Sequence, residues 1–286
     1  NPVIPIRNFS LAAVMISLFL GSPLVVGCGL QPKNKQELSG LISKNIPVLE
    51  EGQLADYQGA IADYTKAIKI NPLDADVYYN RGIVKRKLGD YQGAIADYTK
   101  AIKINPLDSE SFNNRGYAKA NSGNYQGAII DYTKAIKINP LGSDVYYNRS
   151  VARLELGDYS GAIADSTKAI GFNSLDADFY YNRGLAKIRL ADYQGSIADS
   201  TKAIMIDPQY ADAYKNRSVA KGALGDYEGA IVDSAKVLEI NPLDAVAYNN
   251  RGYARANLGD YQGAIADYTK AIEINPRDLD FYYNRS

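Results

Sequence analysis

Seven asparagines recur at one fixed interval and form the most distinctive chemical pattern of the chain. They follow one another every 34 residues: Asn80, Asn114, Asn148, Asn182, Asn216, Asn250 and Asn284. A carboxamide has one acceptor oxygen and two N–H donors, which match the N–H and C=O groups of an extended peptide backbone. The row therefore predicts a ladder that binds a peptide irrespective of its sequence. Two alternatives stay open: each asparagine bonds a neighbouring helix, or duplication has simply copied it.

Arginines and aspartates recur with the same period. The arginines are Arg81, Arg115, Arg149, Arg183, Arg217, Arg251 and Arg285, and the aspartates are Asp63, Asp97, Asp131, Asp165, Asp199, Asp233 and Asp267. A forked guanidinium suits a carboxylate in a partly buried seam. We predict that each arginine pairs with the aspartate of its own repeat. A clamp for a phosphate or carboxylate ligand is the alternative.

The composition excludes the commonest catalytic and metal chemistry. Among 286 residues there is no His and one Cys, and 32 basic side chains balance 32 acidic ones. Without histidine there is no Ser-His-Asp or Cys-His catalysis and no histidine-ligated metal. Zero net charge is also atypical of nucleic-acid binders. We expect no enzyme activity, cofactor, metal site or small-molecule substrate, and no nucleic-acid partner.

A repeated helical unit must position these side chains. The run DYQGAIADYTKAIKINP at 56–72 recurs unchanged at 90–106, and close copies begin at Asn124, Asp158, Asp192, Asp226 and Asp260. A fixed period of this length predicts a stacked array. In unit 75–108, a first helix is expected over 76–88, ended by Gly89 in a left-handed conformation. Asp90 then caps a second helix that runs to Ile104.

This unit resembles the tetratricopeptide repeat, through Tyr78, Gly82, Ala94, Tyr98, Ala101 and Pro106 at the family spacings. The resemblance implies an all-α solenoid of antiparallel helix pairs forming a right-handed superhelix, whose first helices line a concave groove. The array would cover 53–286, with a partial unit 41–74, six full units over 75–278 and a truncated unit 279–286. No capping element is visible, so we expect a fragment truncated at both ends.

Some residues depart from the family pattern. The substitutions Ser166, Ser200 and Ser234 stand where the family has tyrosine, and we expect them to weaken packing locally. Arg81 and its equivalents replace a leucine, which fits the predicted ion pairs.

The resemblance implies a scaffold that binds a partner protein or an extended peptide in the concave groove. The asparagines are similar to the asparagine ladder of O-GlcNAc transferase repeats, and Tyr79, Tyr147 and Tyr181 would present rings to the ligand. First-helix positions vary between repeats, which is expected of a binding groove and equally of a drifting solvated face. Two further alternatives are an adaptor region of a larger chain that carries a catalytic domain, and a passive envelope spacer.

The first 28 residues predict a signal peptide or membrane anchor. An apolar run covers 11–20, and Val25-Val26-Gly27-Cys28 resembles a bacterial lipobox, in which Cys28 is lipidated. Residues 29–52 then form a linker or tether. We expect an exported protein of the cell envelope that contacts the membrane through this N-terminal segment, lipid-anchored or membrane-tethered; a secreted or periplasmic protein is the alternative.

Overall fold

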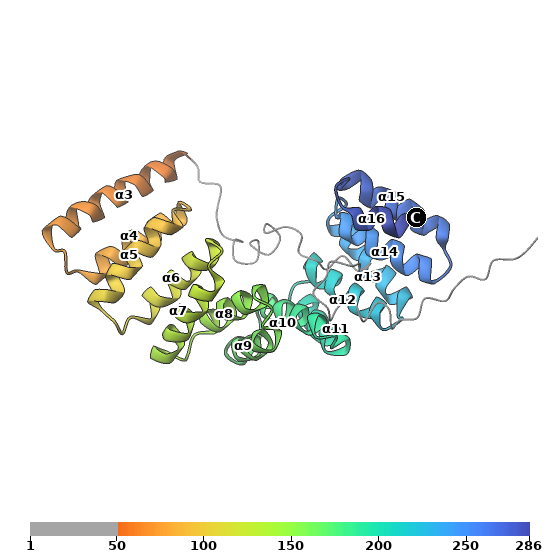
Figure 1. Cartoon of the computed structure of the whole chain (residues 1–286), viewed down its shortest axis with the longest axis horizontal. Helices are drawn as coiled ribbons and strands as arrows, with labels where there is room; N and C mark the ends of the chain where they lie inside the picture. Colours follow the sequence, from red (N-terminus) through yellow and green to blue (C-terminus); the bar gives the residue numbers. More distant parts are fainter. Residues whose placement is uncertain (1–50) are drawn as a thin grey trace, which may run out of the picture. The chain divides into compact units, whose positions relative to one another are not determined.

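Fourteen helices and no strand occur in the part of the chain that the structure describes. A computed structural model describes residues 51–286, so the expected signal segment and nearly all of the tether lie outside it. Figure 1 labels the helices in chain order. Their bounds are α3 Glu51–Ile70, α4 Ala75–Lys87, α5 Tyr91–Ile104, α6 Ser109–Asn121, α7 Tyr125–Ile138, α8 Ser143–Glu155, α9 Tyr159–Phe172, α10 Ala177–Arg189, α11 Tyr193–Ile206, α12 Ala211–Ala223, α13 Tyr227–Ile240, α14 Ala245–Asn257, α15 Tyr261–Ile274 and α16 Leu279–Arg285.

Each full repeat is a helix pair, and the predicted boundaries are confirmed to within one residue in unit 75–108. The first helix, α4, has 13 residues and the second, α5, has 14. Asp90 caps α5 as predicted, because its Oδ1 accepts the Gly93 N–H at 2.9 Å. Gly89 ends the preceding turn with φ 78°, a left-handed conformation that favours glycine. Ala191 adopts the same conformation with φ 59°, at a cost of about 1 kcal/mol for its Cβ.

The first described helix does not follow this capping pattern. Helix α3 begins at Glu51, inside the segment expected to be the tether, and continues through Ala55 and Asp56. The same six residues, Leu-Ala-Asp-Tyr-Gln-Gly, occupy 54–59 and 190–195. At 190–195 they form a turn in which Asp192 caps α11. One hexapeptide thus forms a continuous helix in one place and a cap in the other.

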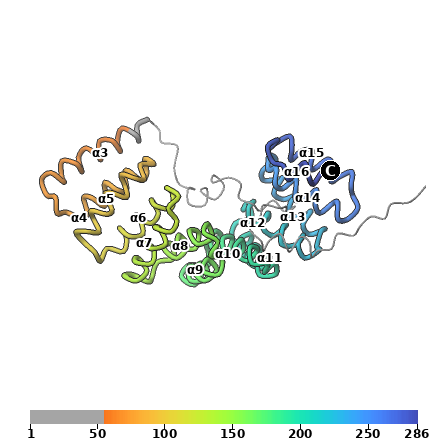
Figure 2. Tube along the Cα trace, viewed as in Figure 1, coloured from red at the N-terminus to blue at the C-terminus, as the bar shows by residue number. Residues whose placement is uncertain are grey.

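The repeats form two blocks, each described by itself. The amino-terminal block comprises α3–α11, residues 51–208, and the carboxy-terminal block comprises α12–α16, residues 209–286. Within a block, a second helix such as α5 packs between the first helix of its own repeat, α4, and that of the next repeat, α6. Successive first helices, such as α4, α6 and α8, also contact one another, whereas successive second helices do not (Figure 2). We call the first helices the inner layer and the second helices the outer layer.

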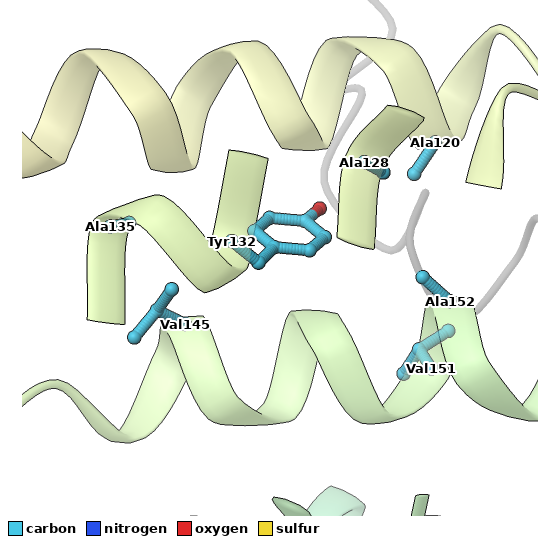
Figure 3. Close-up of a cluster of buried hydrophobic side chains, with 7 residues drawn as sticks. All are labelled: Ala120, Ala128, Tyr132, Ala135, Val145, Val151 and Ala152. Atoms are coloured by element: carbon cyan, nitrogen blue, oxygen red, sulfur yellow. The ribbon is translucent and has the colours of Figure 1, made fainter. Parts of the chain in front are cut away.

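Small residues and tyrosine build the core between the layers. In Figure 3 the ring of Tyr132, from α7, lies among Ala120, Ala128, Val145 and Val151. The tyrosine is fully buried. The predicted apolar stripe of α5 is confirmed in the same way, since Ala94, Tyr98 and Ala101 are all buried. Alanines bring the helices close together, and the aromatic ring fills the remaining space.

Candidate functional site

The predicted arginine–aspartate pairs are present in all six full repeats. Arg115 of α6 donates from Nε and Nη2 to the two carboxylate oxygens of Asp131 in α7, at 2.8 and 2.7 Å. Asp131 is only 1% exposed. The other pairs with this geometry are Arg81–Asp97, Arg149–Asp165, Arg183–Asp199, Arg217–Asp233 and Arg251–Asp267. The hydrogen bonds that Arg81 donates to Asp97 raise the pKa of Arg81.

A second cation, not among the predicted pairs, binds each of the six buried aspartates. Lys119 Nζ lies 2.7 Å from Asp131 Oδ2. The equivalents on the other five aspartates are Lys85, Arg153, Lys187, Lys221 and Arg255. A basic residue four positions after each paired arginine was the available signal, because that spacing puts both cations on one face of the first helix.

In the amino-terminal block, each paired arginine also connects its repeat to the preceding one. Arg115 Nη1 donates to Thr99 Oγ1 of α5 at 3.1 Å, and its guanidinium lies 5.4 Å from the ring centre of Phe112. One side chain therefore links α5, α6 and α7. Asp63 lies outside this scheme, since Pro47 occupies the arginine position of its repeat. Its exposed carboxylate pairs with Lys66 instead. We call the arginine, the second cation and the aspartate of one repeat its clamp.

The recurring asparagines divide into two classes according to the residue sixteen positions earlier. In the tyrosine class that residue is tyrosine, and the members are Asn80, Asn114, Asn148 and Asn284. In the serine class it is serine, and the members are Asn182, Asn216 and Asn250. All four tyrosine-class side chains are half-buried. The three of the serine class are buried, at 0%, 2% and 5% exposure.

The tyrosine-class asparagines bond along the inner layer. Asn114 Nδ2 donates to the Tyr79 hydroxyl at 3.2 Å and to the Glu110 carbonyl of its own helix at 3.0 Å. Asn148 Nδ2 lies 3.4 Å from Asn113 Oδ1. Asn284 Nδ2 donates to Asn249 Oδ1 at 2.9 Å. In each case the amide reaches the preceding first helix and leaves its own Oδ1 without a hydrogen bond to the described residues.

The serine-class asparagines turn into the core. Asn182 Nδ2 donates to Ser150 Oγ at 2.6 Å and to Ser166 Oγ at 3.0 Å. In the carboxy-terminal block, Ser218 and Ser234 bond each other at 2.7 Å. Asn250 is left with neither amide atom hydrogen-bonded to a described residue.

Ring volume explains the two classes. The rings of Tyr98 and Tyr132 are fully buried between the layers. A Cβ added at Gly82 or Gly116 would lie 2.8 Å from the ring of Tyr98 or Tyr132, respectively. Each buried tyrosine therefore requires a glycine opposite, and together they leave no room for a neighbouring amide. Where serine replaces the ring, the asparagine of the next repeat can occupy the core. Ser166, where we expect weaker packing, accepts a hydrogen bond from Asn182 Nδ2 in place of the contacts of a ring.

Two of the three candidate tyrosines, Tyr79 and Tyr147, contact the next repeat. The Tyr79 hydroxyl donates to Glu110 Oε2 at 2.9 Å, and burial, with this bond, raises the pKa of Tyr79. The ring of Tyr147 lies 5.0 Å from that of Phe179, and its hydroxyl is buried without a hydrogen-bond partner. Tyr181 is half-buried. All three tyrosines lie on first helices, in the inner layer.

A lysine takes the equivalent position in the carboxy-terminal block. Lys215 Nζ lies 2.9 Å from a carboxylate oxygen of both Asp212 and Asp244. Burial lowers the pKa of Lys215, but the two carboxylates outweigh it and raise the pKa. Like Tyr79, this side chain joins successive first helices, because Asp244 is the N-cap of α14.

Family models match most of the helical array. Models described as tetratricopeptide repeat match 75–107, 97–130, 131–164, 177–210 and 245–278, and one described as TPR repeat matches 53–88. The chain contains tetratricopeptide repeats. Such repeats generally serve as non-catalytic interaction scaffolds, and the all-α repeat fold supports that role for this chain. No curated protein matches the chain.

Solved tetratricopeptide structures share this fold. YrrB, described as a TPR protein with an unusual peptide-binding site, is 22% identical with a TM-score of 0.58, over 64% of this chain and 95% of YrrB. MamA is 27% identical with a TM-score of 0.56, over 60% of this chain and 93% of MamA. The C-terminal part of a repeat protein from Cytophaga hutchinsonii is 19% identical with a TM-score of 0.64, over 88% and 99%.

The described residues lack two features, a membrane-spanning helix and a cluster of metal ligands. None of the helices α3 to α16 is both long and apolar enough to cross a bilayer. Within residues 51–286, no three Asp, Glu, Cys or His side chains are grouped to hold a metal ion. Cys28, the candidate lipidation site, lies outside this range.

Proposed function

We propose that the inner layer of the amino-terminal block binds an extended segment of a partner protein through Asn80, Asn114 and Asn148. The observation that carries the proposal is their common state. All three are half-buried on successive first helices, and in Asn114 and Asn148 the Oδ1 atom has no hydrogen bond to the described residues.

The bonds already present define which peptide group each asparagine would take. Both N–H bonds of Asn114 are used, by Tyr79 and by the Glu110 carbonyl. What remains is an acceptor, which matches the N–H of an extended backbone. In this proposal Tyr79 positions Asn114 through its hydroxyl. YrrB, which has a similar fold and a peptide-binding site of its own, gives independent support.

The serine class has a different role in this proposal. The donor atom of Asn182 is held by two buried hydroxyls, and its release would leave these groups unpaired at a cost of about 1–3 kcal/mol. Asn182 would therefore join helices rather than contact the peptide, and Asn216 and Asn250, which are 2% and 5% exposed, would be too deeply buried to contact it.

The proposal is tested by capturing partners from lysate of the producing cells, with quantitative mass spectrometry. The wild-type chain is compared with an Asn80/Asn114/Asn148→Ala variant. The matched control, Gln58/Gln92/Gln126→Ala, removes three exposed carboxamides from the outer layer. We expect the asparagine variant to lose its partners and the glutamine variant to keep them. Equal capture by all three would refute the ladder, and capture by none would favour a passive spacer.

We also propose that the chain is held at the cell envelope through a lipid on Cys28, as the lipobox-like sequence predicts. Mass spectrometry of the protein from its own cells tests this directly. A diacylglyceryl group on Cys28 is the expected result, and an unmodified Cys28 in the mature protein would contradict it.

A further inference from the structure

The outer layer of the amino-terminal block carries a row of lysines that no carboxylate neutralises. Lys100 and Lys103 lie on α5, and Lys134 and Lys137 occupy the same positions on α7. All four are exposed. None forms an ion pair or hydrogen bond with a described residue, whereas the aspartates of the same helices, Asp97 and Asp131, are buried in their clamps. We call these four residues the lysine stripe.

The same positions in the carboxy-terminal block are neutralised. Lys236 Nζ lies 2.7 Å from Glu239 Oε2 in α13, and Lys270 Nζ lies 2.6 Å from Glu273 Oε2 in α15. Glutamate therefore stands where α5 and α7 have Lys103 and Lys137. The zero net charge of the chain conceals this local difference: each stripe helix has two uncompensated positive charges on its outward face.

Exposed apolar side chains accompany the lysine stripe on α7 and just beyond its end. On α7, Ile130, Lys134 and Lys137 follow a spacing of four and three residues, which puts them on one face. Ile130 is 55% exposed, and Leu141, just beyond the helix, is 73% exposed. Lysine is a flexible point charge and lacks the fork of arginine, so it suits a laterally uniform anionic surface better than a shaped bidentate site.

We propose that the lysine stripe binds the anionic surface of a phospholipid bilayer. Lysines attract anionic headgroups, and neighbouring apolar side chains can enter the interface between headgroups and acyl chains. A polyanion such as DNA would satisfy the lysines but would offer nothing to Ile130 and Leu141. This surface lies on the outer layer and is independent of the peptide site proposed for the inner layer.

Vesicle flotation with the mature chain, residues 28–286, prepared without a lipid on Cys28 so that only the protein surface can bind, tests the proposal. Wild type should bind phosphatidylcholine vesicles containing about a third phosphatidylglycerol and bind pure phosphatidylcholine far less. A Lys103/Lys137→Glu variant copies the charge pattern of α13 and α15. Because each lysine near an anionic surface contributes about fivefold, the variant should bind at least tenfold more weakly. Raising the salt concentration should also weaken the binding of wild type, because salt screens the attraction between the lysines and the headgroups.

The matched control uses identical helical positions in the two blocks. Lys100/Lys134→Gln should weaken binding several-fold, and Lys236/Lys270→Gln should leave it unchanged. Circular dichroism checks that each variant remains folded. Equal binding to neutral vesicles, or equal losses in the two glutamine variants, would overturn the proposal. So would retention by DNA or an acidic polypeptide without any preference for anionic vesicles.

Discussion

The repeat 109–142 and the repeat 143–176 have helices of the same lengths but different interiors. In the first, Tyr132 is buried against Gly116. In the second, Ser166 and Ser150 stand at the same two positions and bond Asn182. The tyrosine repeat fills its interior with a ring, and the serine repeat fills it with a polar cluster.

This difference determines what the next first helix presents. After the tyrosine repeat, Asn148 remains half-buried on the inner layer; after the serine repeat, Asn182 is fully buried. A substitution on a second helix thus decides whether an asparagine of the following repeat can meet a ligand. An unbroken row of identical residues in the sequence therefore need not be an unbroken ladder in the structure.

The clamp is common to both kinds of repeat, and its removal should have the largest effect. Asp131→Ala and Asp165→Ala each leave two cations around a buried site without their carboxylate. We expect each to lower the free energy of unfolding by about 3–5 kcal/mol. Chemical denaturation of the full chain measures the loss. A loss confined to one kind of repeat would show that the clamp is not shared.

The glycine opposite the second helix should distinguish the two kinds of repeat next. Gly116→Ala places a Cβ 2.8 Å from the Tyr132 ring, whereas at Gly184 the nearest atom is 3.4 Å away. We expect Gly116→Ala to destabilise by about 1–3 kcal/mol. Gly184→Ala should be neutral or stabilise by up to about 1 kcal/mol, since alanine favours the helix. Thermal unfolding compares the pair, and equal effects would contradict the role of ring volume.

The two asparagine classes should differ in how much they contribute to stability. Asn182→Ala removes two buried hydrogen bonds and should cost about 1–3 kcal/mol. Asn148→Ala removes one long contact of 3.4 Å at a half-buried site, so its cost should stay below about 0.5 kcal/mol. Denaturation curves of both variants give the comparison. A larger loss from Asn148→Ala would invert the assignment of the two classes.

The smallest effect concerns the tyrosine hydroxyls. Burial raises the pKa of Tyr98 to about 12, against about 10 in an unfolded chain. The folded state therefore favours the protonated Tyr98 hydroxyl. Its contribution to stability is complete below pH about 10 and is lost as the pH rises toward about 12. Tyr98→Phe should be nearly neutral at pH about 7, because the hydroxyl has no hydrogen-bond partner. At alkaline pH, the melting temperature of Tyr98→Phe should fall less than that of wild type, because the variant has no hydroxyl to ionise.

Tyr283→Phe is the control for that titration, since Tyr283 is exposed. Melting temperatures of both variants across the alkaline range, relative to wild type, give the result. An identical alkaline response of the two variants would show that burial of Tyr98 does not matter there.

Local and periodic features were predictable from sequence. The cap at Asp90, the left-handed Gly89 and the pairing of Arg81 with Asp97 depend on nearby residues or on one fixed offset. The second cation, Lys85 and its equivalents, recurs with equal regularity. The pairing of Asp97 with Arg81 already satisfies a one-to-one pattern, so periodicity alone does not indicate that Asp97 binds Lys85 as well. Identity of sequence was not sufficient, since residues 54–59 and 190–195 fold differently.

The division of the asparagines could not be predicted in the same way. The serines Ser166, Ser200 and Ser234 were recognised only as weaker packing residues. Their effect on Asn182 depends on what a side chain in one helix leaves empty for a side chain in another, which is a property of volume in three dimensions. Sequence periodicity shows that the asparagines are equivalent in register, but it carries no information about that space.

One structure would test this account most directly: that of the Ser150→Gly/Ser166→Tyr variant, which converts the serine interior into the tyrosine interior. We predict that Asn182 leaves the core of this variant and becomes half-buried. Its Nδ2 should then donate to the hydroxyl of Tyr147, as Asn114 donates to Tyr79 at 3.2 Å. An Asn182 that stays buried beside the introduced ring would contradict the claim that ring volume controls which asparagines face a ligand.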